Sequence, residues 1–401
     1  MIQVTYGYSR DHREDLKQWM VALISSGEGV PQFLQPLDGN ASDKRSLLEA
    51  VTILTQQLKM SGEAAGVYVA DSGIYSTENM TILNEAGVPW ASRVPETTTT
   101  AQVLVREEPE AWQMSADGQR QWWSRVLDLP QGRERWMVVR SKEGEARARP
   151  TLQRQVERDR TTWTQRLWHL GHQPFASHID AEAALAKACQ RLPAWVQVQT
   201  RILAVPKHAK PGRPRKEASP TTQVWHIQAT VRLDDVAVER EAMRRAAYII
   251  GTNLLDGETW PEEAIIALYH EQTVVEKGFA FLKDPLFLAS SVFVKQPERI
   301  MAIAFIMVLC LLVYKVAELR VRQRLVATGQ TVPDQVRKPS ARPTMRWLFQ
   351  CFEGLDLHHT VRPDGTWETE ILRLTDLHRQ ILRLLGPAFE KCYLAGEERV
   401  E

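Results

Sequence analysis

The order of apolar and polar positions in residues 1–95 predicts a small α/β unit. Two apolar runs, residues 18–25 and 30–37, are separated by Ser-Gly-Glu-Gly, a turn composition that predicts an antiparallel hairpin. A helix capped by Asp43 is expected next, because leucine and valine recur after it at three-and-four spacing. The pattern then predicts a strand at 66–70, a helix from Thr77 and a strand at 88–94.

Beyond residue 95 the pattern changes to a tryptophan-rich stretch of mainly strands. Strand-like segments occur at 135–139, 195–205, 224–233 and 246–252, and a helical portion lies at about 151–192. We interpret residues 96–256 as a domain inserted between the first part of the core, 1–95, and a second part, 257–325.

The carboxyl-terminal region, residues 326–401, reads as helical, with a last helix at 370–385 and turn residues, including His358 and His359, at 356–367. Before it, residues 300–314 form an uninterrupted apolar run. As a helix this run is only about 22 Å long, short of the roughly 30 Å core of a bilayer, so it predicts a buried helix. A membrane protein built around this run is the competing interpretation.

Composition and charge fit a soluble globular protein. The 401 residues are 44% hydrophobic and 25% charged, and the formal net charge of +1 argues against a protein that coats nucleic acid everywhere. Residues 133–166 nevertheless hold nine arginines and one lysine against five acids. This stretch is either a basic surface for DNA or a solvated helix laced with ion pairs.

The cysteine and histidine positions predict no zinc site. The four cysteines are far apart, which suits a reducing cytoplasm, and no signal peptide opens the chain. The basic segment 207–216 has a Gly-Arg-Pro centre like that of an AT-hook, which predicts either contact with the DNA minor groove or a plain exposed loop.

Candidate chemistry is concentrated between residues 269 and 283. In a helix of 3.6 residues per turn, the spacing of three, four and seven places four polar side chains on one face: Tyr269, Gln272, Glu276 and Lys283. A carboxylate between a tyrosine, an amide and a lysine suits a metal ion on one side and a phosphate backbone on the other. The alternative is an ordinary solvated helix face.

This spacing resembles the Tyr-x-x-Arg-x-x-x-Glu-x-x-x-x-x-x-Lys signature of DDE transposases of the insertion-sequence-four superfamily. The segments Gly-Tyr-Ser-Arg-Asp-His-Arg from Gly7, Pro-Leu-Asp-Gly-Asn from Pro36 and Ala-Asp-Ser-Gly-Ile-Tyr from Ala70 also look like this family, in its order along the chain. Gln272 departs from the signature arginine and would hold a phosphate without charge assistance.

The resemblance implies an RNase H-like core whose carboxylates hold two Mg²⁺ (or Mn²⁺) ions. Asp71 and Glu276 would be catalytic metal ligands, and Tyr269, Gln272 and Lys283 would contact DNA. The implied partners are double-stranded DNA, as transposon ends and target, and a second copy in a homodimer. The implied location is the bacterial cytoplasm, at the nucleoid.

The first catalytic aspartate of the family has no counterpart here, because its strand would precede the segment that begins at Gly7. We therefore expect a core that lacks or alters its first, central strand, with residues 2–6 as a partial replacement and Asp11 or Asp15 as substitutes for the acid. Two functions remain open: a transposase that cleaves and joins DNA, and a truncated remnant that only binds DNA or a transposase.

Overall fold

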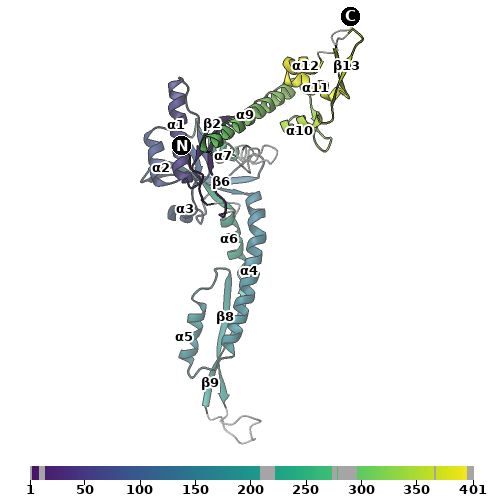
Figure 1. Cartoon of the computed structure of the whole chain (residues 1–401). Coiled ribbons are helices and arrows are strands. Elements are labelled where there is room, and N and C mark those ends of the chain that lie inside the picture. Colours follow the sequence, from purple (N-terminus) through teal and green to yellow (C-terminus); the bar gives the residue numbers. More distant parts are fainter. Residues whose placement is uncertain are drawn as a thin grey trace. The chain divides into compact units, whose positions relative to one another are not determined.

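The computed structural model describes residues 2–8, 14–207, 222–272, 278, 296–364 and 367–394. The chain divides into two compact units, coloured by sequence in Figure 1. Unit 1 comprises Met1–Trp90 and Ala264–Glu401, and unit 2 comprises Ala91–Glu263.

Unit 1 is built on an antiparallel hairpin that has one helix on each face. Ala22 packs with Ala50 on one side, and Leu23 packs with Met307 and Leu311 on the other, so neighbouring strand residues face opposite helices. The predicted hairpin is confirmed. The elements involved are β1 (Met20–Ser25), β2 (Pro31–Leu37), α1 (Asp43–Met60) and α9 (Pro297–Thr328).

The elements after the hairpin also follow the predicted order: β3 (Tyr68–Ala70), α2 (Thr77–Glu85) and β4 (Trp90–Arg93). The predicted N-cap of α1, Asp43, was wrong by one residue, because Ser42 is the N-cap and Asp43 begins the helix. Among the described strands, β1 and β2 form a two-stranded sheet of their own, and neither pairs with β3. The described strands therefore do not form one continuous sheet through the hairpin and β3.

Residues 2–8 do not replace a strand in unit 1. Thr5 forms an isolated antiparallel bridge with Gln18, with backbone bonds of 3.2 and 2.8 Å, just before β1. Gln3 is tied instead to the end of the hairpin, through the Asp38 side chain and the Gly39 N–H.

The apolar run at 300–314 belongs to a helix about twice as long as the run, and the prediction of a buried helix is only half right. α9 has 32 residues, because Glu318 pairs with Lys315 and Arg322 along the helix and Gly329 ends it in the left-handed conformation. Of the described helices, α9 alone is long and apolar enough to span a membrane, which is weak evidence by itself. Only 22% of the most apolar 18-residue stretch of α9 is buried.

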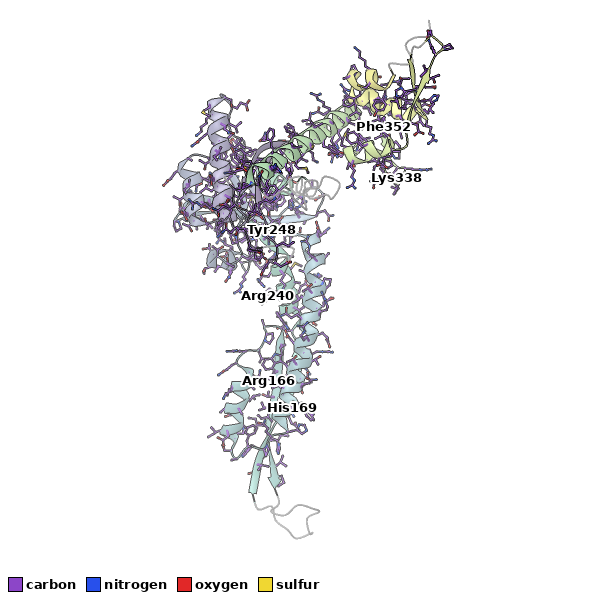
Figure 2. All side chains as sticks on the ribbon, in the orientation of Figure 1. Arg166, His169, Arg240, Tyr248, Lys338 and Phe352 are labelled. Carbon is purple, nitrogen blue, oxygen red and sulfur yellow. The ribbon has the colours of Figure 1, made fainter. Side chains whose placement is uncertain are left out.

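The end of unit 1 contains a small core formed by the second half of α9 with α10 (Met345–Cys351) and α11 (Asp376–Leu385). α12 (Pro387–Leu394) packs against α11. Phe352, labelled in Figure 2, lies 5.0 Å from His378 between ring centroids. A hairpin of β13 (Asp356–Val361) and β14 (Trp367–Leu372) occurs where turn residues at 356–367 and the start of a helix at 370–385 were predicted, and helix α11 begins only at Asp376. Every residue of β13 is exposed, so no alternation of apolar and polar residues marked it in the sequence.

Unit 2 contains an antiparallel sheet in which β4, β10, β7, β6 and β5 follow one another. Its central strand β7 is buried along Glu134–Arg140, which explains the apolar and tryptophan-rich sequence there. The bounds are β5 (Gln113–Met114), β6 (Arg120–Leu129), β7 (Gly132–Ser141) and β10 (Ala247–Thr252).

The rest of unit 2 is a short helix, α3 (Thr99–Leu104), and a long helix packed along a hairpin. α4 (Lys142–Gly171) lies alongside β8 (Val196–Lys207) and β9 (Thr222–Leu233), with α5 (His178–Cys189) and α6 (Asp235–Ala246) beside them (Figure 1). The core between them contains Leu152, Val156, Trp163, Trp195, Val196 and Ala242.

Candidate functional site

Asp71 stands directly after β3, on an exposed turn of unit 1. Its Oδ1 accepts a hydrogen bond of 2.8 Å from the Gly73 N–H, which orients the carboxylate. A Cβ added at Gly73 would lie 2.8 Å from the same Oδ1, too close for any real side chain. Glycine at this position therefore allows the carboxylate to keep its orientation.

The turn that carries Asp71 is held in place by the buried residues that follow it. Ile74 and Tyr75 are each only 4% exposed. The buried Asn79 side chain donates to the Ile74 carbonyl at 2.9 Å and to the Lys44 carbonyl of α1 at 3.0 Å, which joins the turn to two helices. Ser76 caps α2 by accepting from the Asn79 N–H at 3.2 Å. A carboxylate on such a support is preorganised.

The polar stripe predicted on one helix is interrupted in the structure. α7 (Glu262–His270) ends just after Tyr269, and Glu271 and Gln272 form a turn. The Glu271 N–H is shared between the carbonyls of Ala267 and Leu268, both at 3.2 Å, which is the tightened geometry of a helix end. The prediction of one helix from Tyr269 to Lys283 is therefore wrong at Glu271 and Gln272, and Glu276 and Lys283 lie outside the described residues.

The two described members of the stripe differ in their surroundings. Tyr269 is 6% exposed, and its ring meets His270 edge-on at 5.8 Å, so in this structure the ring contributes to packing. Gln272 is half-buried, and its N–H reaches the Tyr269 carbonyl at 3.4 Å. Their contacts with DNA stay predictions.

Two positions after Glu276 in the sequence, the structure describes Gly278. Gly278 is buried, and a Cβ added to it would lie 3.6 Å from Leu311 of α9 and 3.7 Å from Leu23 of β1. Gly278 therefore lies against the hairpin core of unit 1, the unit that also contains Asp71.

Asp71 fits a divalent metal ion by the chemistry of its oxygen donors, which are hard ligands of the kind Mg²⁺ prefers. Within the described ranges, no group of three His, Cys, Asp or Glu side chains could hold a metal ion. Of the proposed substitutes for a further acid, Asp15 lies in an exposed turn, and Asp11 lies outside the described residues.

The basic stretch 133–166 is largely paired with acids inside unit 2. Arg147 and Arg160 each meet a glutamate on the same helix, at 2.9 and 2.7 Å. Arg149 binds Glu239 and Glu145, and these hydrogen bonds raise the pKa of its guanidinium. Arg166, labelled in Figure 2, lies 4.8 Å from the Trp163 ring centroid. These contacts favour the ion-paired helix over an open basic surface. The segment 208–221, which includes most of the AT-hook-like sequence, lies outside the described residues.

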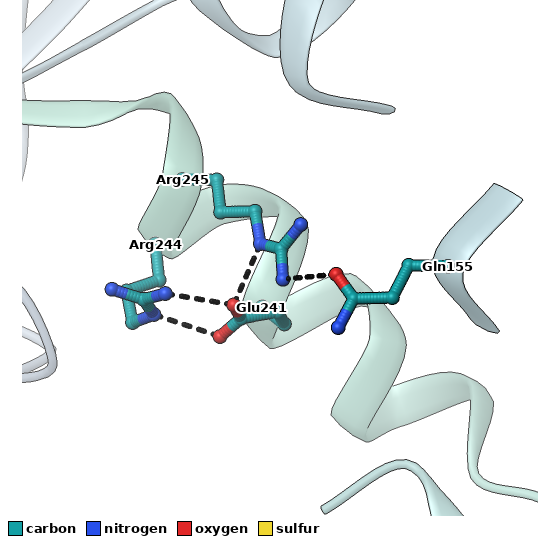
Figure 3. A network of polar contacts seen from close by, with 4 residues as sticks. All are labelled: Gln155, Glu241, Arg244 and Arg245. Carbon is teal, nitrogen blue, oxygen red and sulfur yellow. Dashed lines mark hydrogen bonds and ion pairs between the residues drawn. The ribbon is translucent and has the colours of Figure 1, made fainter. Parts of the chain in front are cut away.

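A second arginine network ties α6 to α4 (Figure 3). Glu241 accepts two bonds of 2.7 Å from Arg244 and one of 2.7 Å from Arg245, which also donates to Gln155 of α4 at 2.9 Å. The hydrogen bonds from Arg244 are the largest cause that lowers the pKa of the Glu241 carboxyl.

An open pocket of about 510 Å³ in unit 2 was not predicted from the sequence. The Trp123 indole lines it, is 7% exposed, and has a buried Nε1 without a hydrogen-bond partner among the described atoms. Arg125 lies 5.1 Å from the centroid of that ring. The paired tryptophans at 122 and 123 were the available signal, although tryptophans in strands are usually core residues.

Comparison with known protein families identifies the family of the chain. The family model described as Transposase DDE domain matches residues 5–313, more than half of the 401 residues. The chain therefore belongs to the DDE transposase domain family, whose members generally use divalent metal ions and act on DNA. No curated protein and no solved structure matches the chain.

Proposed function

We propose that this transposase is encoded by a bacterial insertion sequence of the insertion-sequence-four superfamily and that it cleaves transposon ends and joins them to target DNA. Family membership is the observation that carries the proposal. The anchored Asp71 carboxylate supports it, because a metal ligand must be held in place before the metal arrives.

In this proposal Asp71 and Glu276 hold Mg²⁺ or Mn²⁺ in an RNase H-like core interrupted by unit 2. When bound, such ions lower the pKa of a water or a DNA 3′ hydroxyl and stabilise charge on the leaving oxygen. Gly73 and Asn79 keep the Asp71 carboxylate aimed at its site. Tyr269, Gln272 and Lys283 contact the DNA backbone near the cleaved end, with the weakest contact expected at Gln272.

The partners in this proposal are double-stranded DNA and a second copy of the chain, acting in the bacterial cytoplasm at the nucleoid. A homodimer allows two ends to be cut and joined in one complex.

The test is DNA cleavage by the full chain, with Mg²⁺ or Mn²⁺ and a DNA fragment that carries the sequences flanking the gene on both sides. Asp71→Asn and Glu276→Gln should each reduce metal-dependent nicking at the ends by at least about 10³-fold, because each removes a charged metal ligand while keeping side-chain shape. DNA binding, measured by anisotropy, should change much less.

Glu85→Gln is the matched control, since Glu85 is an exposed carboxylate on α2 of the same unit and should leave nicking unchanged. If the unmodified chain binds end DNA but never nicks it with either metal, the catalytic proposal fails. The remnant that only binds DNA or another transposase is then the correct interpretation.

A further inference from the structure

The first half of α9 has one face packed in unit 1 and an apolar face open to solvent. Ile300, Ala304, Met307 and Leu311 form the packed face, each at most 8% exposed. On the opposite side, five apolar side chains are between 41% and 66% exposed: Met301, Phe305, Ile306, Leu309 and Val313. We call these five residues the α9 outer face. A contiguous apolar row of this kind marks an interaction site.

The charges at the two ends of the α9 outer face identify the partner. Glu298 lies eleven residues before Leu309, and Arg320 lies eleven residues after it. Eleven residues make just over three turns, so both charges fall on the same side of the helix as Leu309, about 17 Å from it in opposite directions. Both side chains are exposed, and neither forms an ion pair with a described residue.

We infer that a second copy of this chain binds the α9 outer face, with the two α9 helices antiparallel and crossing at Leu309. A two-fold axis at Leu309 places Phe305 of one copy against Val313 of the other. The same axis brings Glu298 of each copy to Arg320 of the other, so the four end charges pair off. A parallel arrangement would set like charges against each other at both ends.

This surface serves the homodimer of the proposed function, but it requires neither DNA nor metal. One helix from each copy buries less than the roughly 1,200 Å² of a stable complex, so a Kd of about 1–100 µM is expected. The experiment therefore uses sedimentation of the full chain alone, over a concentration range that spans this value. Nicking activity is measured separately, so that dimerisation and catalysis can fail independently.

The unmodified chain should show a reversible monomer–dimer equilibrium, and Leu309→Asp should remain monomeric throughout. Ile82→Asp is the control, because Ile82 is an exposed apolar residue on α2 of the same unit. Circular dichroism and thermal melting should show that both variants fold like the unmodified chain.

Charge reversal then tests the antiparallel arrangement. Glu298→Arg alone and Arg320→Glu alone should each raise the Kd by about tenfold or more, because each places like charges together at both ends of the pair. The double reversal should return the Kd to within about threefold of the original. A chain that stays monomeric, a dimer insensitive to Leu309→Asp, or a double reversal without rescue overturns the inference. Flotation of the monomer with phosphatidylglycerol vesicles, abolished by Leu309→Asp, would assign the face to lipid and overturn it too.

Discussion

The two longest described helices, α4 in unit 2 and α9 in unit 1, have opposite compositions. α4 has 30 residues and is rich in arginine and glutamate, whereas α9 has 32 residues and an apolar first half. By composition, α4 is a candidate DNA surface and α9 a candidate buried helix. In the structure Arg147, Arg149 and Arg160 of α4 have carboxylate partners, and one face of α9 is open to solvent.

The difference teaches that composition alone does not identify which face of a long helix is available. A charged residue can form an ion pair with a neighbour one turn away, and an apolar residue can lie on the face opposite the packed one. Each helix has one face in contact with other residues and one face open to solvent. Substitutions on both faces distinguish them by their effect on stability and binding.

The largest contrast is expected across α4, between its two tryptophans. Trp163 is 6% exposed in the core of unit 2, and Trp163→Ala should lower the free energy of unfolding by about 3–5 kcal/mol. Trp168 is 59% exposed, and its ring meets those of His169 and His172, with centroids 5.0 and 3.9 Å apart, so Trp168→Ala should cost about 1 kcal/mol or less. Urea unfolding measures both, and equal costs would show that α4 has no preferred buried face.

The same comparison on α9 should give a slightly smaller effect. Leu311 is fully buried against the hairpin, and Leu311→Ala should cost about 2–5 kcal/mol of unfolding free energy. Val313, two residues away, is 66% exposed, and Val313→Ala should change stability by less than about 0.5 kcal/mol in dilute solution. Urea midpoints measured well below the expected dimer Kd decide this. A costly Val313→Ala under those conditions would mean that the monomer already covers the α9 outer face.

Local elements were predictable where one physical rule dominates. The β1–β2 hairpin followed from two apolar runs around a glycine turn, and the order of β1, β2, α1, β3, α2 and β4 followed from periodicity. The hairpin of β13 and β14 was missed, because β13 is exposed along its whole length and its sequence carries no alternation of apolar and polar residues. The end of α7 at His270 was missed as well, because the polar spacing that suggested a functional stripe is equally compatible with a helix that stops.

The residues of the candidate site were predictable from the sequence, but the hydrogen bonds that orient Asp71 were not. The type and position of Asp71, at the end of a short strand, could be read from the sequence. Its orientation depends on the Gly73 N–H and on Asn79, whose bond to the Lys44 carbonyl spans 35 positions. No local pattern predicts such a long-range bond, and the roles of Glu276, Tyr269, Gln272 and Lys283 stay predictions.

A moderate effect is expected at the Glu241 network, which connects α6 to the side of α4. The pKa of Glu241 is lowered in the folded chain, chiefly by the Arg244 hydrogen bonds, so its stabilisation is present above the unfolded carboxyl pKa of about 4.3 and is lost as pH falls through the lower folded pKa. Glu241→Gln should cost about 1–2 kcal/mol at neutral pH. Unfolding measured from neutral pH down to acid should show the variant and the original chain converging. A gap that stays constant would mean that the carboxylate charge contributes nothing.

The smallest effect is expected from the paired arginines on the exposed side of α4. Replacing both Arg147 and Arg160 with glutamine should change the free energy of unfolding by about 0.5 kcal/mol or less, because each ion pair is exposed and joins residues about one helical turn apart. It should also leave the salt dependence of DNA binding unchanged, whereas removal of one arginine that binds a phosphate would reduce the slope of log K against log salt by about 0.9. Arg158→Gln is the matched comparison, since Arg158 is exposed and forms no ion pair with a described residue. Anisotropy over a range of KCl concentrations measures all three slopes. If the slope of the double variant fell by about 1.8, the ion pairs of α4 would open on DNA, and its charged face would be as available to a partner as the apolar face of α9.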